Sequence, residues 1–181
     1  MIKGFKIRLY PNKEQEKIMW EHIYGCRYLW NYMLALQESR YQNKKKYLSA
    51  YDMINTLPTL KNDGEHNWLK SLSSHSLKFI CHDLDKAYKL FFQGINEKPQ
   101  FKTKKRGINK FPIRQDVLRI NNNGEFCVEK IGKVRFKSDH QFKFNQKGIF
   151  LNPRISFIDG KWYLSFSMNM ETRNNIPCFN K

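Results

Sequence analysis

Two periodicities of apolar residues divide the chain into a first strand, a helical middle and a strand-rich second half. Residues 3–10 alternate apolar and mostly basic side chains, which predicts a half-buried strand with a basic face. From Lys13 to about Tyr41 apolar residues recur at intervals of three and four, which predicts one long helix.

Two more helices are predicted before the pattern changes. Ser49 and Asp52 have the spacing of a capping box, and we expect Pro58 to end the short helix that they open. A third helix is expected from near Ser74, after a serine cluster, up to Gly94. A basic stretch with few side chains that could pack follows it, and we expect a loop there.

From about residue 111 onward the sequence alternates in short runs that are typical of β-strands. Asn123-Gly124 and Asp159-Gly160 are strong two-residue hairpin signals, and the second is expected to join Ile155-x-Phe157 to the run that starts at Trp162. The predicted strands cover residues 117–121, 126–129, 133–137, 141–144, 149–151, 154–158 and 162–170.

These elements predict an α+β fold in which a small antiparallel barrel or sandwich carries an inserted lobe of about three helices. The isolated first strand needs a sheet to join, so the helical block is expected to interrupt the sheet in sequence. The expected boundaries are 1–12 for the first strand, 13–106 for the helical lobe, 107–170 for the other strands and 171–181 for an unstructured tail.

The composition favours a polyanionic partner. Lysine and arginine number 33 against 16 acidic residues, which gives a net charge of +17. Such an excess costs folding free energy through self-repulsion unless a polyanion neutralises it. The basic residues are spread along the chain rather than gathered on one amphipathic helix, which argues against a membrane surface. Nucleic acid is therefore the expected partner, and rings that make up 15% of the chain suit base stacking as well as core packing.

The sequence shows no sign of a membrane span, a secretory signal or a metal site. No apolar run is long enough to cross a bilayer, and the first residues lack the apolar stretch of a signal peptide, so a cytoplasmic protein is expected. The cysteines form no Cys-x-x-Cys pair and have no histidine at zinc spacing, so we expect free thiols, no metal and no cofactor. The side chains to which we assign no ligand role are Cys26, Cys81, Cys127, Cys178, His22, His66, His82 and His140.

Several short motifs follow one another in an order that is more specific than any one of them. The first strand leads into Arg8-Leu9-Tyr10-Pro11-Asn12-Lys13-Glu14-Gln15, and the first helix contains Tyr28-Leu29-Trp30-Asn31-Tyr32-Met33-Leu34. Later motifs are Trp68-Leu69, the run from Asp83 to Phe92, Pro99-Gln100-Phe101-Lys102, Ile131-Gly132-Lys133-Val134 and Gly160-Lys161-Trp162-Tyr163. In this order, over almost the whole chain, they resemble the TnpB (OrfB) family of transposon-encoded RNA-guided DNA endonucleases.

The resemblance implies a fold and a set of partners. In that family the first and later strands form an oligonucleotide-binding-type barrel, called the wedge, and the inserted helices form a recognition lobe. The family protein holds a guide RNA from its own transposon end and recognises a short motif in duplex DNA beside the target, while base pairing chooses the sequence. Double-stranded DNA and a guide RNA are therefore the expected partners.

The sequence departs from the family at its end. Family members continue with a RuvC-like nuclease that opens with a Gly-Ile-Asp segment, and with a four-cysteine zinc module, and neither is found here. Cleavage with two metals needs carboxylates that converge on ions about 4 Å apart. The acidic residues of the strand-rich half are scattered singly: Asp116, Glu125, Glu129, Asp139 and Asp159.

We therefore expect no cleavage by this chain alone. A truncated TnpB-type protein would bind its DNA and occlude it rather than cut it. Two alternatives stay open, namely half of a split nuclease whose RuvC half is a separate chain, and a non-functional transposase remnant.

By the layout of the family, the start of the third helix, the second helix and the chain around Phe111 approach the motif-bearing DNA. Hydroxyls, helix N-terminal amides and lysine suit phosphates and base edges, and Arg and Gln bind G and A edges bidentately. The candidates are Ala50, Tyr51, Ser73, Ser74, His75, Lys78, Arg114 and Gln115. The alternatives are helix capping for the serines, a solvated charge for Lys78, and an ordinary surface strand for Arg114 and Gln115.

Other cations are candidates for contacts to RNA or to a phosphate backbone that do not depend on sequence. They are Lys102, Lys104, Lys105 and Arg106 in the basic stretch, and Lys6, Arg8, Lys133, Arg135 and Lys137 on the polar faces of predicted strands. A charge run is a solvated loop in most proteins, but the positive excess of the whole chain favours binding.

A helix-turn-helix over residues 13–92 is an alternative DNA-binding arrangement for the basic helices. The predicted loops are long, and no short glycine-containing turn would set a recognition helix at the usual angle. The alternative therefore fits poorly.

Overall fold

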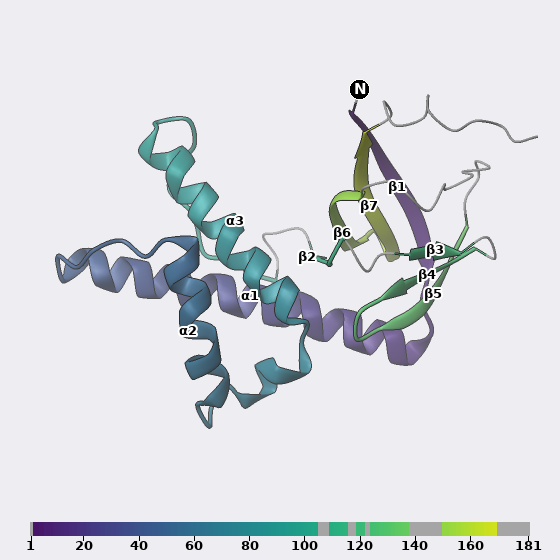
Figure 1. The fold of residues 1–181 in the computed structure, drawn as a ribbon, viewed down its shortest axis with the longest axis horizontal. Helices are drawn as coiled ribbons and strands as arrows, with labels where there is room; N and C mark the ends of the chain where they lie inside the picture. The colour runs from purple at the N-terminus through teal and green to yellow at the C-terminus, as the bar shows by residue number, and fades with distance from the viewer. Residues whose placement is uncertain (1, 105–108, 116–118, 122–123, 138–149, 170–181) are drawn as a thin grey trace, which may run out of the picture.

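The computed structural model describes residues 2–104, 109–115, 119–121, 124–137 and 150–169. Strand β1 (Ile2–Tyr10) precedes the helical part, which consists of α1 (Lys13–Gln42), α2 (Ala50–Asn62), the 3-10 segment η1 (Asn67–Ser71) and α3 (Ser74–Phe92). The later strands are β2 (Asn109–Pro112), β3 (Arg119–Asn121), β4 (Glu125–Val128), β5 (Gly132–Lys137), β6 (Phe150–Ile158) and β7 (Lys161–Asn169). Figure 1 shows a curled sheet beside a helical lobe, with α1 running beneath both. The predicted α+β class is confirmed.

The first strand lies in the middle of the sheet. Within the described residues the sheet has seven strands in the order β2-β6-β7-β1-β5-β4-β3, and all neighbours are antiparallel. β1 pairs with β7 from Ile2↔Asn169 to Leu9↔Trp162, and with β5 at its other edge. The helices are therefore inserted in sequence between β1 and its partners, as the isolated first strand predicted.

The Asp159-Gly160 hairpin is confirmed. Both residues have positive φ, 48° and 75°, as a two-residue turn between twisted strands requires. The register that follows places Phe157 opposite Trp162. At the other predicted hairpin Gly124 has φ 74°, and β3 pairs with β4, while Asn123 is outside the described residues. The predicted strand at 141–144, the tail 171–181 and Cys178 are also outside them.

α1 begins at a complete capping box. The Asn12 side chain accepts from the backbone N–H of Gln15 at 2.8 Å, and the Gln15 side chain accepts from the backbone N–H of Asn12 at 3.0 Å. Thirty residues at 1.5 Å each give a rod of about 45 Å. That length lets the helix reach from the sheet to the far end of the lobe.

The first turns of α1 pack against the sheet. Gln15 donates from Nε2 to the carbonyl of Lys133 at 2.7 Å, and Glu16 accepts from the indole N–H of Trp162 at 3.0 Å. The Trp20 ring packs edge-on against Trp162, with centroids 5.3 Å apart. The same helix continues into the lobe, so it is a shared wall between the two parts.

Pro58 does not end α2, and the predicted stop there was wrong. The helix continues to Asn62. A proline inside a helix costs about 3 kcal/mol because it removes one N–H and crowds the preceding turn. Leu57 and Leu60 flank it with 3% and 7% of their surface exposed, and burying one leucine stabilises by roughly 1.5–3 kcal/mol. Packing therefore offsets the cost of the proline.

The first turn of α3 is held by both α1 and the sheet. The backbone N–H of Ser73 donates to His22 Nε2 at 3.1 Å, and the Ser73 hydroxyl donates to Glu129 at 2.8 Å. One turn later the Ser76 hydroxyl donates to the carbonyl of Pro112 at 2.6 Å. The predicted helix start near Ser74 is confirmed, and these bonds fix its position on the sheet.

His22 gives this junction a pH dependence. Its Nδ1–H donates to the carbonyl of Ile18 at 2.8 Å while Nε2 accepts from Ser73, so the ring is held in the neutral form. Burial lowers the pKa of His22 below its ordinary 6.5. The unfolded chain therefore binds a proton below pH 6.5 that the folded chain resists, and this part of the stability is lost as the pH falls.

We expect wild-type unfolding free energy to fall more steeply than that of His22→Gln between pH 7.5 and 5.5, by up to about 1.4 kcal/mol per pH unit below 6.5. Urea denaturation across this range measures it. His82→Gln is the matched control because His82 is exposed on α3. Parallel curves for wild type and His22→Gln would contradict a buried neutral His22.

Candidate nucleic-acid interface

One face of the curled sheet is basic and carries aromatic rings. Its residues are Lys6, Arg8 and Tyr10 of β1, Lys133, Arg135 and Lys137 of β5, and Tyr163 of β7, and we call them the basic sheet face. The register places Arg8 between Lys137 and Tyr163, and Tyr10 opposite Arg135. The five strand cations that the sequence singled out therefore lie on one surface. The other face carries Ile7, Leu9 and Val134, which are buried.

The cations of this face lie over tyrosine rings. Lys6 Nζ is 4.3 Å from the centroid of the Tyr163 ring, and the Arg8 guanidinium is 5.0 Å from that of Tyr10. Arg8 Nε is buried and has no hydrogen-bond acceptor among the described residues. A buried N–H without an acceptor is costly, so Arg8 adds to the free-energy cost of this face.

Like charges stand directly opposite one another on this face. Arg8 and Lys137 are cross-strand partners, an arrangement that destabilises a sheet. The register places Glu125 of β4 opposite Arg135 of this face. In the described part of the chain these two side chains form no ion pair within 4.0 Å. A bound polyanion would remove the repulsion.

A second basic cluster surrounds the start of α3. Lys61, near the end of α2, donates to the Ser74 hydroxyl at 2.9 Å. Burial lowers the pKa of Lys61, and the nearby charges of Lys78 and Lys130 lower it further. The three lysines therefore lie close enough to repel one another, beside a helix N-terminus.

The structure separates the DNA candidates of this region. Ser73 is 4% exposed and its hydroxyl is used in capping α3 and in bonding Glu129, so its geometry favours the capping alternative. Ser74 and Lys78 are exposed and His75 is half-buried. Arg114 and Gln115 follow Pro112, which bonds to the first turn of α3, so they belong to the same neighbourhood.

The candidates on α2 lie elsewhere. Ala50 is buried, whereas Tyr51 is 72% exposed. Ten residues separate Tyr51 from Lys61, which is about 15 Å along the helix. Tyr51 is therefore not beside Ser74, although it lies on the same lobe.

The basic stretch does not form a uniform solvated loop. Lys98 is ion-paired with Glu38 at 2.8 Å, and Lys104 is exposed, while Lys105 and Arg106 are outside the described residues. Lys102 points inward: its Nζ lies 3.4 Å from the centroid of the Trp30 ring. Asn31 holds this segment by two bonds to the Lys102 backbone, at 2.8 and 2.9 Å.

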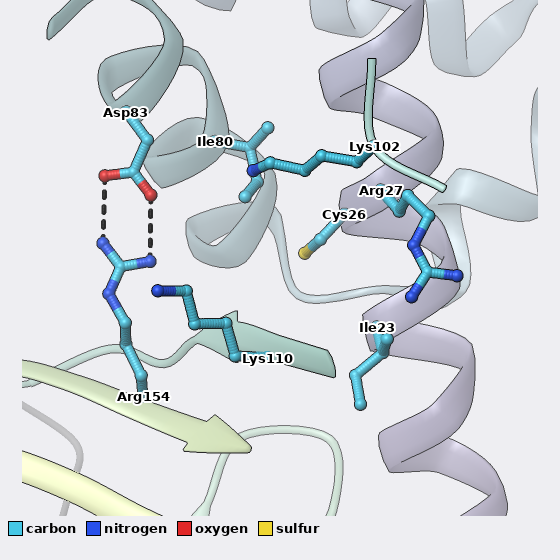
Figure 2. Close-up of a pocket in the computed structure, with 8 residues that line it drawn as sticks. All are labelled: Ile23, Cys26, Arg27, Ile80, Asp83, Lys102, Lys110 and Arg154. Carbon is cyan, nitrogen blue, oxygen red and sulfur yellow. Dashed lines mark hydrogen bonds and ion pairs between the residues drawn. The ribbon is translucent and has the colours of Figure 1, made fainter. Parts of the chain in front are cut away.

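Lys102 lines a cavity of about 240 Å³ where α1, α3 and the sheet meet. Figure 2 shows its side chain crossing between α1 and α3, with Lys110 of β2 and Arg154 of β6 on the sheet side. Arg154 forms a two-pronged ion pair with Asp83 of α3, with both N–O distances 2.9 Å.

Several of these residues were not found by sequence reasoning. Lys61 was given no role, Arg154 was placed in a strand without a role, and neither Arg27 nor Lys110 was singled out. Each acquires its surroundings from residues far away in sequence, so no local pattern could have identified it.

His66, to which the sequence gave no role, joins two elements. Its Nε2 lies 2.6 Å from the Tyr28 hydroxyl of α1, and its Nδ1 lies 3.0 Å from the Asp63 carboxylate.

Within the described residues no group of three or more His, Cys, Asp or Glu is placed to hold a metal ion. In the same residues no helix has the length and apolarity needed to cross a membrane.

Residues 1–46 match the helix-turn-helix domain of the IS605 OrfB family. In this structure the described part of that segment is β1 followed by the single helix α1, so the matched name does not describe its geometry. The poor fit of a helix-turn-helix to the sequence agrees with this arrangement.

The chain is also similar to InsQ of Escherichia coli (strain K12), to which RNA-guided DNA endonuclease activity is provisionally assigned. The two are 33% identical over 176 residues, which cover 97% of this chain and 42% of InsQ. The chain therefore spans less than half the length of that relative. The domain match at the N-terminus and the near-complete coverage of the chain agree with the order of motifs in the sequence. The chain belongs to the TnpB/OrfB family and corresponds to its N-terminal part.

Proposed function

We propose that this chain binds a guide RNA on the basic sheet face and recognises a short motif in duplex DNA through the cluster at the start of α3. The observation that carries the proposal is the pairing of Arg8 with Lys137 across two strands, with Arg8 Nε buried and lacking an acceptor. An arrangement that costs folding free energy on its own is stabilised by a phosphate backbone.

The sheet face suits RNA whose contacts do not depend on sequence. Its cations can neutralise phosphates, and Tyr10 and Tyr163 offer rings on which unpaired bases stack. Tyr10 is 44% exposed, so its ring is open to such stacking.

The α3 cluster suits duplex DNA. Exposed Ser74 and Lys78 lie at a helix N-terminus, which favours phosphate, and Gln115 nearby has a side chain that can pair with an adenine edge. This division between backbone contacts and base contacts is the one that RNA-guided recognition of DNA requires.

The first experiment is to express the chain with the DNA that flanks its gene and to sequence the RNA that purifies with it. One species that maps to the adjacent transposon end supports the proposal. Mixed cellular RNA that is lost as salt rises would leave only non-specific binding and would reject the guide.

For RNA binding we expect the double variant Arg135→Gln/Lys137→Gln to have a weaker salt dependence than the wild type. The negative slope of log affinity against log salt should become shallower by about 1.4, because each single-strand phosphate contact contributes about 0.7. Filter binding at several salt concentrations measures the slope. Lys70→Gln/Lys86→Gln changes the net charge equally on exposed helical sites and should leave the slope unchanged. An equal drop in both double variants would point to net charge alone.

For DNA recognition we expect Gln115→Ala to lose preference at one base position while keeping the others, since a bidentate contact discriminates by about 1–3 kcal/mol. Selection from a duplex library with randomised positions measures it. Gln93→Ala, at the other end of α3, is the control. An unchanged base preference in Gln115→Ala would remove Gln115 from the recognition site.

A further inference from the structure

Half of the residues that line the cavity between α1, α3 and the sheet are cations. Its lining includes Arg27, Lys102, Lys110 and Arg154 against a single carboxylate, Asp83. Four positive charges against one negative charge leave a formal excess of three. The rest of the lining is Ile23, Cys26 and Ile80, and burial raises the pKa of the Cys26 thiol to about 12, so it stays neutral.

Asp83 is already occupied by Arg154, which uses both carboxylate oxygens. Arg27 donates to the neutral side chain of Asn109 at 2.6 Å, and Lys102 lies over the Trp30 ring. In the described part of the chain no ion pair joins Arg27, Lys102 or Lys110 to a carboxylate. Arg27 and Lys102 are half-buried and Lys110 is exposed. Burying a charge without a counterion costs free energy, so the half-buried cations without a carboxylate favour a bound anion.

The electrostatics of Lys102 agree with this geometry. Burial lowers its pKa to about 8, Asp83 opposes the shift, and Lys110 and Arg154 increase it. The cations are therefore close enough to repel one another, and an anion among them would restore the charged form of Lys102.

Lys110, which lines the cavity, is on the same side of the sheet as the basic sheet face. The cross-strand register runs from Lys110 to Ser156, Tyr163, Arg8 and Lys137, which are successive partners on five neighbouring strands. Four strand spacings of about 4.8 Å put Lys110 some 19 Å from Lys137 along the curved surface. A nucleic-acid strand that lies across the face can therefore extend one phosphate into the cavity.

We propose that this cavity is a phosphate-binding site, in which Lys102 and Lys110 hold one backbone phosphate of the nucleic acid that covers the basic sheet face. This inference rests on the proposed function, because the phosphate is supplied by the nucleic acid that the proposed function places on the sheet. Arg154, held by Asp83, adds positive charge at the wall. Because the lining comes from α1, α3, β2 and β6, the bound phosphate also holds the helical lobe against the sheet.

The test uses the full chain and the co-purifying RNA or, failing that, a single-stranded oligonucleotide. We expect Lys102→Met to weaken binding at least about tenfold, as loss of a charged hydrogen bond would. Lys102→Arg should retain the affinity, since it keeps the charge. Lys86→Met, which removes an exposed lysine of α3, is the matched control and should bind like wild type.

Proton uptake separates a binding role from a structural one. At pH 8 Lys102 is about half protonated, so binding should take up a fraction of a proton, measured by calorimetry in buffers of different ionisation enthalpy. The uptake should vanish in Lys102→Arg and persist in Arg135→Gln/Lys137→Gln. Wild-type uptake that equals that of Lys102→Arg would overturn the proposal.

Acetylation of lysines at pH 8, read by mass spectrometry, distinguishes the source of the phosphate. The probes are the oligonucleotide and inorganic phosphate, with chloride at matched ionic strength as the blank. Protection of Lys102 by the oligonucleotide, together with weaker binding of Lys102→Met, supports the proposal.

Protection by inorganic phosphate with normal oligonucleotide binding in Lys102→Met would overturn the backbone assignment but leave the proposed function intact. Protection by inorganic phosphate in a chain that binds no oligonucleotide would reject the proposed function, and no protection by either probe would reject the site.

Discussion

The hydrogen bonds at the first turn of α3 set the position of this helix, on which the basic cluster at its start and the cavity beside Asp83 depend. His22 on α1 accepts from the Ser73 backbone, and Glu129 and Pro112 on the sheet side accept from the Ser73 and Ser76 hydroxyls. Because the Ser73 and Ser76 hydroxyls point inward, the two residues between them in sequence lie nearer the surface. Ser74 is exposed for this reason, and so is Lys78 one turn further on. The same bonds fix α3 against β2, and Asp83 then lies within reach of Arg154.

The charges of a chain with a net charge of +17 are balanced differently in the helical lobe and in the sheet. The ion pairs Lys89–Asp85 and Lys98–Glu38 involve helices of the lobe, so carboxylates neutralise part of the positive charge there. On the sheet face Arg8 and Lys137 are paired with each other instead. The repulsion is therefore concentrated where a ligand can relieve it, which is how a protein that binds a polyanion can keep its affinity without a general loss of stability.

Local patterns predicted the elements well where a local cause determines them. The capping residues at Ser49 and Ser73, the turn at Asp159 and the period of α1 all depend on residues a few positions apart. Pro58 was misjudged because the packing of Leu57 and Leu60 against distant residues outweighs the proline. The strand cations were predicted to lie on the polar faces of their own strands, and the pairing of β1 with β5 brings these faces together on one surface. The inward direction of the Lys102 side chain could not be predicted from a local pattern, because the Trp30 ring and the Asn31 side chain that Lys102 contacts lie about seventy residues earlier.

The position of the cavity at the seam has a mechanical consequence. α1 is the shared wall of lobe and sheet, and within the described residues the seam near the cavity is bridged by the ion pair Asp83–Arg154 and by the bond from Arg27 to Asn109. Without an anion, Lys102 and Lys110 repel each other and Arg154 across this seam, which opposes its closure. With a phosphate present, the cations on both sides of the seam are attracted to the same anion. The electrostatic interaction between lobe and sheet at this place therefore changes from repulsion to attraction on binding. The bound phosphate would then add to the hydrogen bonds at the first turn of α3 in holding the lobe against the sheet, and contact with duplex DNA would be thermodynamically coupled to the strand already bound.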